Sequence, residues 1–216
     1  MPLIFSTGQW VDASVSVSAE CQWPDATALE AVLPVAAEDG SYASGVVYER
    51  NKVLTAAHAL STSYRVFVSV NDEFRPARIL MIDRHKDLAV LSVDTGSIAP
   101  LPIASKGLES RQPVWAVGFP RASGKETSSG VFTRETRGAV HTSAPIDQGQ
   151  SGGGLLRCDN GSYRLAGMLR GYGAYVKDDQ FVKLKNHSVS VAAATIERFV
   201  NSATVATGST RIVSLE

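Results

Sequence analysis

A dominant charge, a long apolar run and a recognisable leader are all lacking in this 216-residue sequence. Lysine and arginine together number 21, aspartate and glutamate also number 21, and neither sign forms a long run. This balance favours neither a nucleic acid nor an anionic membrane as a partner. No apolar run approaches the roughly 18 residues of a membrane span. Residues 1–10, MPLIFSTGQW, have no charged start and no long apolar core, so we expect no signal peptide and a cytoplasmic location.

Cysteine is scarce as well, with Cys21 and Cys158 as the only two. No CxxC pair and no cluster of cysteine with histidine is present, which argues against a zinc site. We therefore expect neither a metal nor an organic cofactor. The two cysteines could form one disulfide, but two reduced thiols is the interpretation that we favour.

The remaining composition is that of a globular protein, with 44% hydrophobic and 19% charged residues. Short apolar stretches divided by turn residues are typical of an all-β sandwich or barrel. The first predicted set of antiparallel strands spans about 35–94 and comprises residues 44–49, 52–56, 64–70, 77–83 and 88–94. After a linker at 95–112, the second set comprises residues 113–119, 130–140, 141–145, 153–158, 163–171 and 174–178. Asn160 and Gly161 predict a hairpin tip within the second set, because this pair tolerates the positive φ angles of a tight turn.

Two segments are predicted to be helical. Residues 25–33, DATALEAVL, begin with Asp25 as a candidate N-cap and end just before Pro34. Residues 192–202 begin with AAATIERFV, which places its large apolar residues on one helical face. The small and polar residues 204–216 are expected to form a flexible tail.

The stretch DQGQSGGGLL, residues 147–156, is rich in glycine around Ser151. A serine hydroxyl attacks a carbonyl only if a neighbouring base takes its proton, and acyl transfer also needs donors for the oxyanion that forms. Gly149 can adopt φ angles that are closed to other residues, so the N–H groups of Gly149 and Ser151 could point to one spot as an oxyanion hole. A glycine-rich turn with an incidental serine is the alternative.

Four histidines are candidates for the base. His58 follows a predicted strand in the alanine-rich segment VLTAAHAL, whose small residues would let an imidazole reach a neighbouring unit. His85 lies in the charged loop DRHKD and is expected to be solvated. His141 and His187 have no obvious partner. His58 is therefore the preferred partner of Ser151.

A short carboxylate at a strand edge would orient that base. Asp87 directly precedes the predicted strand at 88–94, so the strand would anchor it. Asp83 also lies at a strand end and is the competitor. We prefer Asp87, on the family pattern given next.

The motifs TAAH, DLAVL and GQSGG place His58, Asp87 and Ser151 in that order, 29 and 64 residues apart. This arrangement resembles the trypsin/chymotrypsin-like serine proteases, and it is most similar to the protease domain of bacterial HtrA/Deg-type proteases. The similarity runs over most of the chain. The segments that carry it are ALEAVLPV (28–35), SGVVYERNKVLTAAHAL (44–60), FRPARILMIDRHKDLAVLSVD (74–94), PVWAVGFP (113–120) and TSAPIDQGQSGGGLL (142–156).

The resemblance implies an all-β fold of two six-stranded antiparallel barrels, with the active site between them, in a single domain over 1–203. The first barrel would supply His58 and Asp87, and the second would supply Ser151. Ser151 would attack the scissile carbonyl, His58 would relay its proton to the leaving amine, and Asp87 would orient His58. The amides of Gly149 and Ser151 would form the oxyanion hole. The implied partner is a polypeptide substrate, and no oligomeric state follows from the sequence.

The resemblance also bounds the side-chain preference. Pro145 and Ile146 occupy positions that line the primary pocket in the family, and Tyr172 is expected to form another wall. No carboxylate lies at the pocket base, so a preference for arginine or lysine is not expected. A pocket for small or aliphatic side chains is one hypothesis. Arg170, which stands where the family has a small hydroxyl residue, could instead favour an acidic side chain.

Four further features depart from the family or extend it. Gln150 stands where relatives commonly carry aspartate or asparagine. No buried Ile-Val-Gly-Gly start is evident, so activation by N-terminal cleavage is not expected. The polar, glycine- and serine-rich segment 121–132 is a candidate mobile loop, and the strand at 167–173 should offer its edge to the substrate backbone.

Two other functions compete with a serine endopeptidase. One is a binding module that keeps the protease fold with an idle catalytic triad. The other is an esterase, since GQSGG also fits GxSxG, but that motif needs a helix after the serine and the sequence here predicts a strand.

Overall fold

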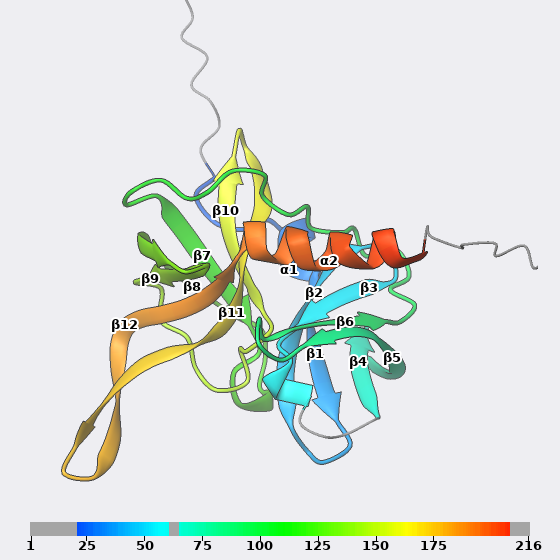
Figure 1. Ribbon diagram of the computed structural model, residues 1–216, viewed down its shortest axis with the longest axis horizontal. Coiled ribbons are helices and arrows are strands. Elements are labelled where there is room, and N and C mark those ends of the chain that lie inside the picture. The colour runs from blue at the N-terminus through cyan, green and yellow to red at the C-terminus, as the bar shows by residue number, and fades with distance from the viewer. Residues whose placement is uncertain (1–20, 61–64, 208–216) are drawn as a thin grey trace, which may run out of the picture.

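A computed structural model describes residues 21–60 and 65–207 of the chain, without the side chains of 203–207. Two closed antiparallel barrels of six strands each stand side by side (Figure 1). The predicted all-β fold of two six-stranded barrels is therefore confirmed. The N-terminal residues 1–10 and the tail residues 208–216, which carried sequence predictions, lie outside the described residues.

The two barrels have the same topology. Counted from its own first strand, each barrel closes in the order 1-2-3-6-5-4. The first barrel consists of β1 (Val32–Ala37), β2 (Tyr42–Glu49), β3 (Lys52–Thr55), β4 (Val66–Val70), β5 (Glu73–Asp83) and β6 (Leu88–Ser92). The second consists of β7 (Pro113–Gly118), β8 (Glu126–Thr136), β9 (Ala139–Thr142), β10 (Gly154–Asp159), β11 (Ser162–Lys177) and β12 (Gln180–Ala192).

Helical segments precede the first strand, follow the last strand and lie in two of the loops between strands. They are α1 (Ala26–Glu30), η1 (His58–Leu60), η2 (Pro120–Ala122) and α2 (Ala193–Thr207). Ile196 and Phe199 of α2 are buried in a core that also contains Leu91 of the first barrel. The last helix thus spans the junction of the two barrels, as Figure 1 shows. None of the described helices is long and apolar enough to cross a membrane.

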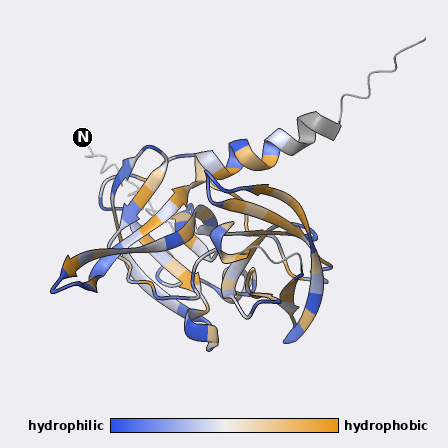
Figure 2. Cartoon of the chain, turned by 60° about the horizontal axis from the view of Figure 1, so that its bottom comes forward, coloured by the Kyte–Doolittle hydropathy of each residue, from blue (hydrophilic) through white to orange (hydrophobic). Residues whose placement is uncertain are grey.

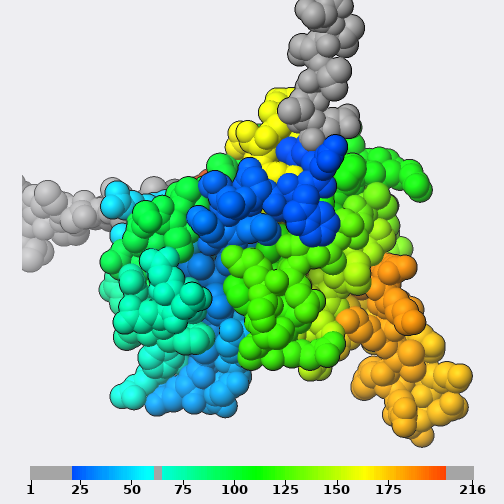
Figure 3. All heavy atoms as spheres, turned by 180° about the vertical axis from the view of Figure 1, so that it is seen from behind, coloured from blue at the N-terminus to red at the C-terminus, as the bar shows by residue number. Residues whose placement is uncertain are grey.

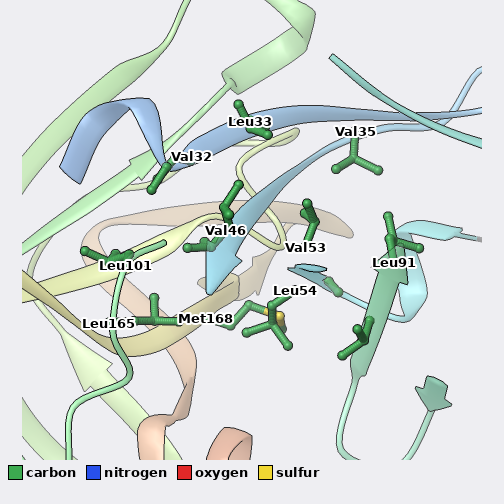
Figure 4. Close-up of a cluster of buried hydrophobic side chains, with 14 of the residues drawn as sticks. Val32, Leu33, Val35, Val46, Val53, Leu54, Leu91, Leu101, Leu165 and Met168 are labelled. Atoms are coloured by element: carbon green, nitrogen blue, oxygen red, sulfur yellow. The ribbon is translucent and has the colours of Figure 1, made fainter. Parts of the chain in front are cut away.

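One hydrophobic core runs through both barrels. Figure 4 shows Val46 and Leu54 of the first barrel in one cluster with Leu165 and Met168 of β11, and all four are fully buried. Replacing such a residue by alanine typically costs about 2–5 kcal/mol, because a cavity remains. A continuous core of this kind fixes the two barrels relative to each other. That matters for a site built from residues of both.

The N-terminal helix is shorter than the sequence predicted. The side chain of Asp25 caps it by accepting the N–H of Ala28 at 2.8 Å, as expected. The helix ends at Glu30, however, and the helical prediction for residues 32 and 33 is wrong because Val32 begins β1. Pairing with Val46 of β2 leaves Val32 fully buried, and this tertiary burial outweighs the local helical pattern.

The last two strands also differ from their prediction. The expected strands at 163–171 and 174–178 are parts of one long β11, and β12 was not predicted. The turn between β11 and β12 consists of Asp178 and Asp179, both at positive φ. The predicted hairpin tip at Asn160 and Gly161 is present between β10 and β11. The helix expected to end near residue 202 continues to Thr207.

The hairpin of β11 and β12 extends away from the body of the molecule (Figures 1 and 3). Hydrophobic and hydrophilic residues are mixed at its far end, as the hydropathy colours of Figure 2 show. The exposed large apolar residues of this hairpin are Tyr175, Val176, Phe181 and Leu184. The expected mobile loop at 121–132 is in part regular structure, because β8 begins at Glu126 and pairs with β7.

Cys21 and Cys158 form a disulfide, so the expectation of two reduced thiols is wrong. The fold brings their Cα atoms to 5.8 Å, within the range that a disulfide spans. The bond joins the segment before α1 to β10 of the second barrel. The cysteines are 137 residues apart, and only the fold could bring them together.

Candidate active site

His58 and Asp87 meet at the ends of two paired strands of the first barrel. His58 opens η1 just after β3, and Asp87 directly precedes β6. The pairing of Thr55 with Ala89 brings these two strand ends together. The ring Nδ1 of His58 lies 2.8 Å from Oδ2 of Asp87, and the main-chain N–H of His58 donates to Oδ1 at 2.9 Å. Two hydrogen bonds therefore fix the carboxylate against the imidazole.

Asp87 adopts a backbone φ of 60°, a left-handed conformation that aspartate tolerates better than most residues. The competing candidate Asp83 lies in the same turn but points elsewhere. Its carboxylate accepts the main-chain N–H groups of His85 and Lys86 and pairs with the Lys86 ammonium. The structure thus pairs Asp87 with His58 and leaves Asp83 to hold the turn.

The Asp87 carboxylate is ionised at neutral pH. Burial raises the pKa of Asp87, but the hydrogen bonds from His58 and the charges of His58 and Arg170 outweigh it, so the net pKa is lowered. A carboxylate can only accept, so Nδ1 of His58 must carry a proton. The other ring nitrogen, Nε2, is then free to take a proton from a nucleophile.

Ser151 reaches the junction on the loop between β9 and β10, which contacts the first barrel. The Ser44 N–H of β2 donates to the Ser151 carbonyl at 2.9 Å. Gly152 has a φ of +84°, and a Cβ there would lie 2.1 Å from the Ser44 carbonyl oxygen. Only glycine permits this approach, and it places Ser151 beside the first barrel.

The serine hydroxyl is linked to the first barrel through Arg170. Ser151 Oγ donates to the Arg170 carbonyl oxygen at 3.2 Å, and no hydrogen bond joins it to His58 within the described residues. Nε of Arg170 in turn lies 3.2 Å from Oδ2 of Asp87. Hydrogen bonds between a nucleophile and its base are often long without substrate and tighten when it binds.

Two amides of the serine loop are free to bind an anion. Gly149 has a φ of +90°, and the Gln148 carbonyl before it accepts the Arg121 N–H at 2.8 Å. In a trans peptide the C=O and N–H point in opposite directions, so the Gly149 N–H points away from Arg121. Neither the Gly149 nor the Ser151 N–H donates to any acceptor among the described residues. These are the two donors that the sequence predicted as an oxyanion hole.

An ionic cluster, here called the Asp147 clamp and made of Arg121, Asp147 and Lys183, holds this loop. Asp147 pairs with the Arg121 guanidinium and lies 3.2 Å from the Lys183 Nζ. The hydrogen bond from Arg121, together with those from Gln148 and Lys183, lowers the pKa of Asp147 to about 2 against the opposing effect of burial. Gln150 closes the loop, because its side-chain oxygen accepts the Asp147 N–H at 2.7 Å.

Sequence reasoning missed the Asp147 clamp. Its cations lie 26 and 36 residues from the aspartate along the chain, so no local motif joins them. The same reasoning noted Gln150 only as a departure from the family. In the structure Gln150 is 3% exposed and orders the nucleophile loop.

The three residues predicted to line the substrate pocket differ in burial and in their contacts. Ile146 is buried, and Tyr172 packs against the same cluster of the second barrel. The Lys183 Nζ lies 4.7 Å from the centre of the Tyr172 ring. Pro145 is exposed, and its carbonyl accepts the Ser128 hydroxyl.

The other histidines make no hydrogen bond to Ser151 within the described residues. His85 is exposed in the β5–β6 turn. His141 and His187 contact each other at 3.0 Å on neighbouring strands β9 and β12. Within residues 21–60 and 65–207, no group of three or more histidine, cysteine, aspartate or glutamate side chains could hold a metal ion.

Comparison with known proteins matches this chain to a family of peptidase domains. A family model described as a trypsin-like peptidase domain matches residues 43–168, a range that contains His58, Asp87 and Ser151. Protease Do-like 1, chloroplastic, from Arabidopsis thaliana is 31% identical over 130 residues, which are 52% of this chain and 30% of that protein. The chain therefore spans less than a third of that relative's length.

Solved structures show the same fold. The serine endoprotease from Yersinia pestis matches with a TM-score of 0.70 and 22% identity, over 84% of this chain and 67% of that one. The HtrA-type protease AlgW, solved with a tripeptide, matches with a TM-score of 0.69 and 22% identity, over 82% of this chain and 60% of that one.

Proposed function

Because the chain belongs to the trypsin-like peptidase domain family, we propose that it is a serine endopeptidase that works through a Ser-His-Asp triad. One observation carries the proposal. The hydrogen-bonded pair of His58 and Asp87 lies at the same barrel junction as a serine loop in which the Gly149 and Ser151 amides donate to no acceptor among the described residues. This is the set of groups that acyl transfer from a peptide requires.

In the proposed reaction, the Ser151 oxygen bonds to the scissile carbonyl carbon while its proton moves to Nε2 of His58. The ionised Asp87 stabilises the resulting imidazolium, and the Gly149 and Ser151 N–H groups bind the oxyanion. When the tetrahedral intermediate collapses, the C–N bond breaks and His58 gives the proton to the leaving amine. A water molecule then attacks the acyl-enzyme by the same route and releases the acid.

A polypeptide substrate fits the free edge of β11. Beyond Leu169 this edge has no neighbouring strand in the described part of the chain, so an extended peptide can add to it. AlgW, which shares the fold, was solved with a tripeptide and with a decapeptide. Ile146 and Tyr172 near this edge favour a small or aliphatic side chain before the cleaved bond. A strong preference for arginine or lysine in a peptide-library digest would contradict that part of the proposal.

An idle scaffold is the second candidate, and the missing hydrogen bond between His58 and Ser151 is the observation that favours it. Treatment with a fluorophosphonate probe separates the two. If the protein is an endopeptidase, the probe labels Ser151 and the protein digests casein, whereas the Ser151→Ala variant is not labelled and does not digest casein. A matched Ser162→Ala variant, on the remote β10–β11 hairpin, keeps both activities. Correctly folded protein that neither labels nor digests casein would support the scaffold.

The cellular compartment of the protein is also a matter of proposal. A cytoplasmic location was expected from the sequence, and it stays a prediction. Disulfides persist mainly in oxidising compartments, so the bond between Cys21 and Cys158 favours such a compartment instead. Fractionation of the native host, with alkylation to report the thiol state of both cysteines, decides between the two.

A further inference from the structure

Arg170 lies on β11 at the junction of the barrels and contacts residues of both. Its Nε lies 3.2 Å from Oδ2 of Asp87, and its main-chain oxygen accepts the Ser151 hydroxyl at 3.2 Å. The proposed reaction gives the guanidinium no task. A cation placed beside the carboxylate that must stabilise an imidazolium works against that stabilisation, so its presence needs a reason.

The Arg170 guanidinium has more donors than its partner uses. Arginine carries five N–H groups in a planar fork, and within the described residues Asp87 is its one partner, at Nε. The Asp87 side chain is 5% exposed and already bonded to His58, whereas the Arg170 side chain is 52% exposed. The outer nitrogens of the guanidinium therefore remain available to a ligand at the junction.

An extended substrate would pass directly over Arg170. Main-chain hydrogen bonds join Leu169 to Gly152 and Gly153, and the free edge of β11 begins at the next residue. The scissile carbonyl carbon must lie at Ser151 Oγ, which is 3.2 Å from the Arg170 oxygen. The N–H of the residue before the cleaved bond is then the group that can reach this oxygen.

Side chains of an extended peptide alternate between its two faces. If the residue before the cleaved bond points towards Ile146 and Tyr172, the preceding residue points to the opposite face, towards His58 and Arg170. We propose that Arg170 is a specificity residue that binds an acidic side chain at this position, the second before the cleaved bond. The proposal rests on the endopeptidase function and names its substrate class, peptides with aspartate or glutamate there.

An acidic side chain at this position would also favour the transition state. It would attract the Arg170 guanidinium away from Asp87 and would face the imidazolium of His58, which exists only while the proton is in transit. An interaction that is stronger in the transition state than in the bound substrate raises kcat. We therefore expect glutamate to raise kcat and to lower KM relative to glutamine.

A cleavage profile on a proteome-derived peptide library tests the proposal, followed by rates for matched glutamate and glutamine peptides based on the best sequence. The native enzyme should favour glutamate by about tenfold in kcat/KM, the usual worth of a hydrogen bond between charged groups. Arg170→Gln should reduce this glutamate-to-glutamine ratio to about one, and Arg170→Lys should keep part of it. Arg170→Glu should instead favour a matched peptide with lysine at the same position. Arg164→Gln, a half-buried arginine of the same strand that pairs with Asp159, should leave the ratio unchanged.

Each result decides the matter. Equal cleavage of the glutamate and glutamine peptides by the native enzyme would overturn the assigned specificity and leave the peptidase function intact. The same holds if Arg170→Gln slows both peptides equally and keeps their ratio, because the arginine would then act only on the position of Asp87. Absence of cleavage together with absence of fluorophosphonate labelling would overturn the peptidase function itself.

Discussion

The two barrels share one strand order but supply the site in different ways. In the first barrel, His58 and Asp87 stand directly at the ends of β3 and β6, whose residues are almost all buried. In the second barrel, Ser151 lies on a long loop that is held by Gln150 and the Asp147 clamp. The strands that carry the base and its aspartate are thus positioned by apolar packing, whereas polar contacts hold the loop of the nucleophile and the oxyanion hole.

This difference predicts how each half responds to change. A packed strand end tolerates changes of pH and salt but not a change in the hydrogen bonds of its polar group. A loop held by ion pairs depends on charge and on the few backbone angles that shape it. We therefore expect changes of charge, pH and salt to alter activity mainly through the serine loop of the second barrel.

The largest effect is expected at the carboxylate that orients the base. In Asp87→Asn the amide would donate to Nδ1 of His58, which shifts the ring proton to Nε2 and blocks proton transfer from Ser151. We expect kcat/KM to fall about 10⁴-fold, the loss typical of such a change. Peptide hydrolysis measures it, with Asp83→Asn as the matched control. Equal losses in the two variants would show that the turn, and not the carboxylate at His58, is what matters.

The next effect is expected in the nucleophile loop. A Cβ at position 149 would lie 2.6 Å from the Phe119 carbonyl oxygen, at a φ of +90°. Gly149→Ala must therefore rotate the peptide and lose an oxyanion donor, which costs about 100- to 1,000-fold in kcat. Gly124→Ala, where a Cβ meets nothing within 4 Å, should retain full activity. Full activity in Gly149→Ala would place the oxyanion hole elsewhere.

The disulfide should affect stability without affecting the site. Cys158 lies near the end of β10 that is remote from the serine loop, so the double variant Cys21→Ser with Cys158→Ser should keep its kcat/KM. Loss of the bond typically costs about 2–4 kcal/mol, which lowers Tm by about 4–16 °C in a chain of this size. Calorimetry of the two forms measures the shift. An unchanged Tm would mean that the bond does not restrain the unfolded chain.

The smallest effect is expected at the Asp147 clamp. Its ion pairs are partly exposed, so Asp147→Asn should lower kcat/KM about two- to fivefold at pH 7. The pKa of Asp147 is lowered to about 2, so its charge stabilises the folded state above about pH 4 and this contribution is lost as the pH falls towards 2. Urea unfolding of both proteins should show a stability difference at pH 7 that disappears over that range. A difference that persists at pH 2 would point to packing instead of charge.

The sequence was most informative where the evidence is local. DLAVL predicts a buried strand with an aspartate at its start, and GQSGG predicts a loop whose glycines permit unusual backbone angles. The fold class followed from such stretches and from the family pattern, because barrels of short strands leave regular turn signals. Even so, the strand β12 was missed, because its polar residues 185–188, KNHS, interrupt the alternation of polar and apolar residues.

Several contacts that the sequence could not predict join distant segments of the chain. Asp147 pairs with Arg121 and Lys183, Cys21 bonds to Cys158, and the Arg170 side chain pairs with Asp87. These contacts exist only in the folded protein. Nothing in the spacing of these residues along the chain encodes their separation in space. The ion pairs that hold the serine loop therefore emerged from the structure alone.

The central claim is that an imidazole of the first barrel serves a hydroxyl of the second. A crystal structure of the protein after reaction with a peptidyl phosphonate tests it most directly. We predict phosphorus bonded to Ser151 Oγ, a phosphonyl oxygen about 3 Å from both the Gly149 and Ser151 nitrogens, and Nε2 of His58 within hydrogen-bond reach of the adduct. An adduct at Ser151 with the His58 ring far beyond that reach, or an adduct on another residue, would contradict the claim.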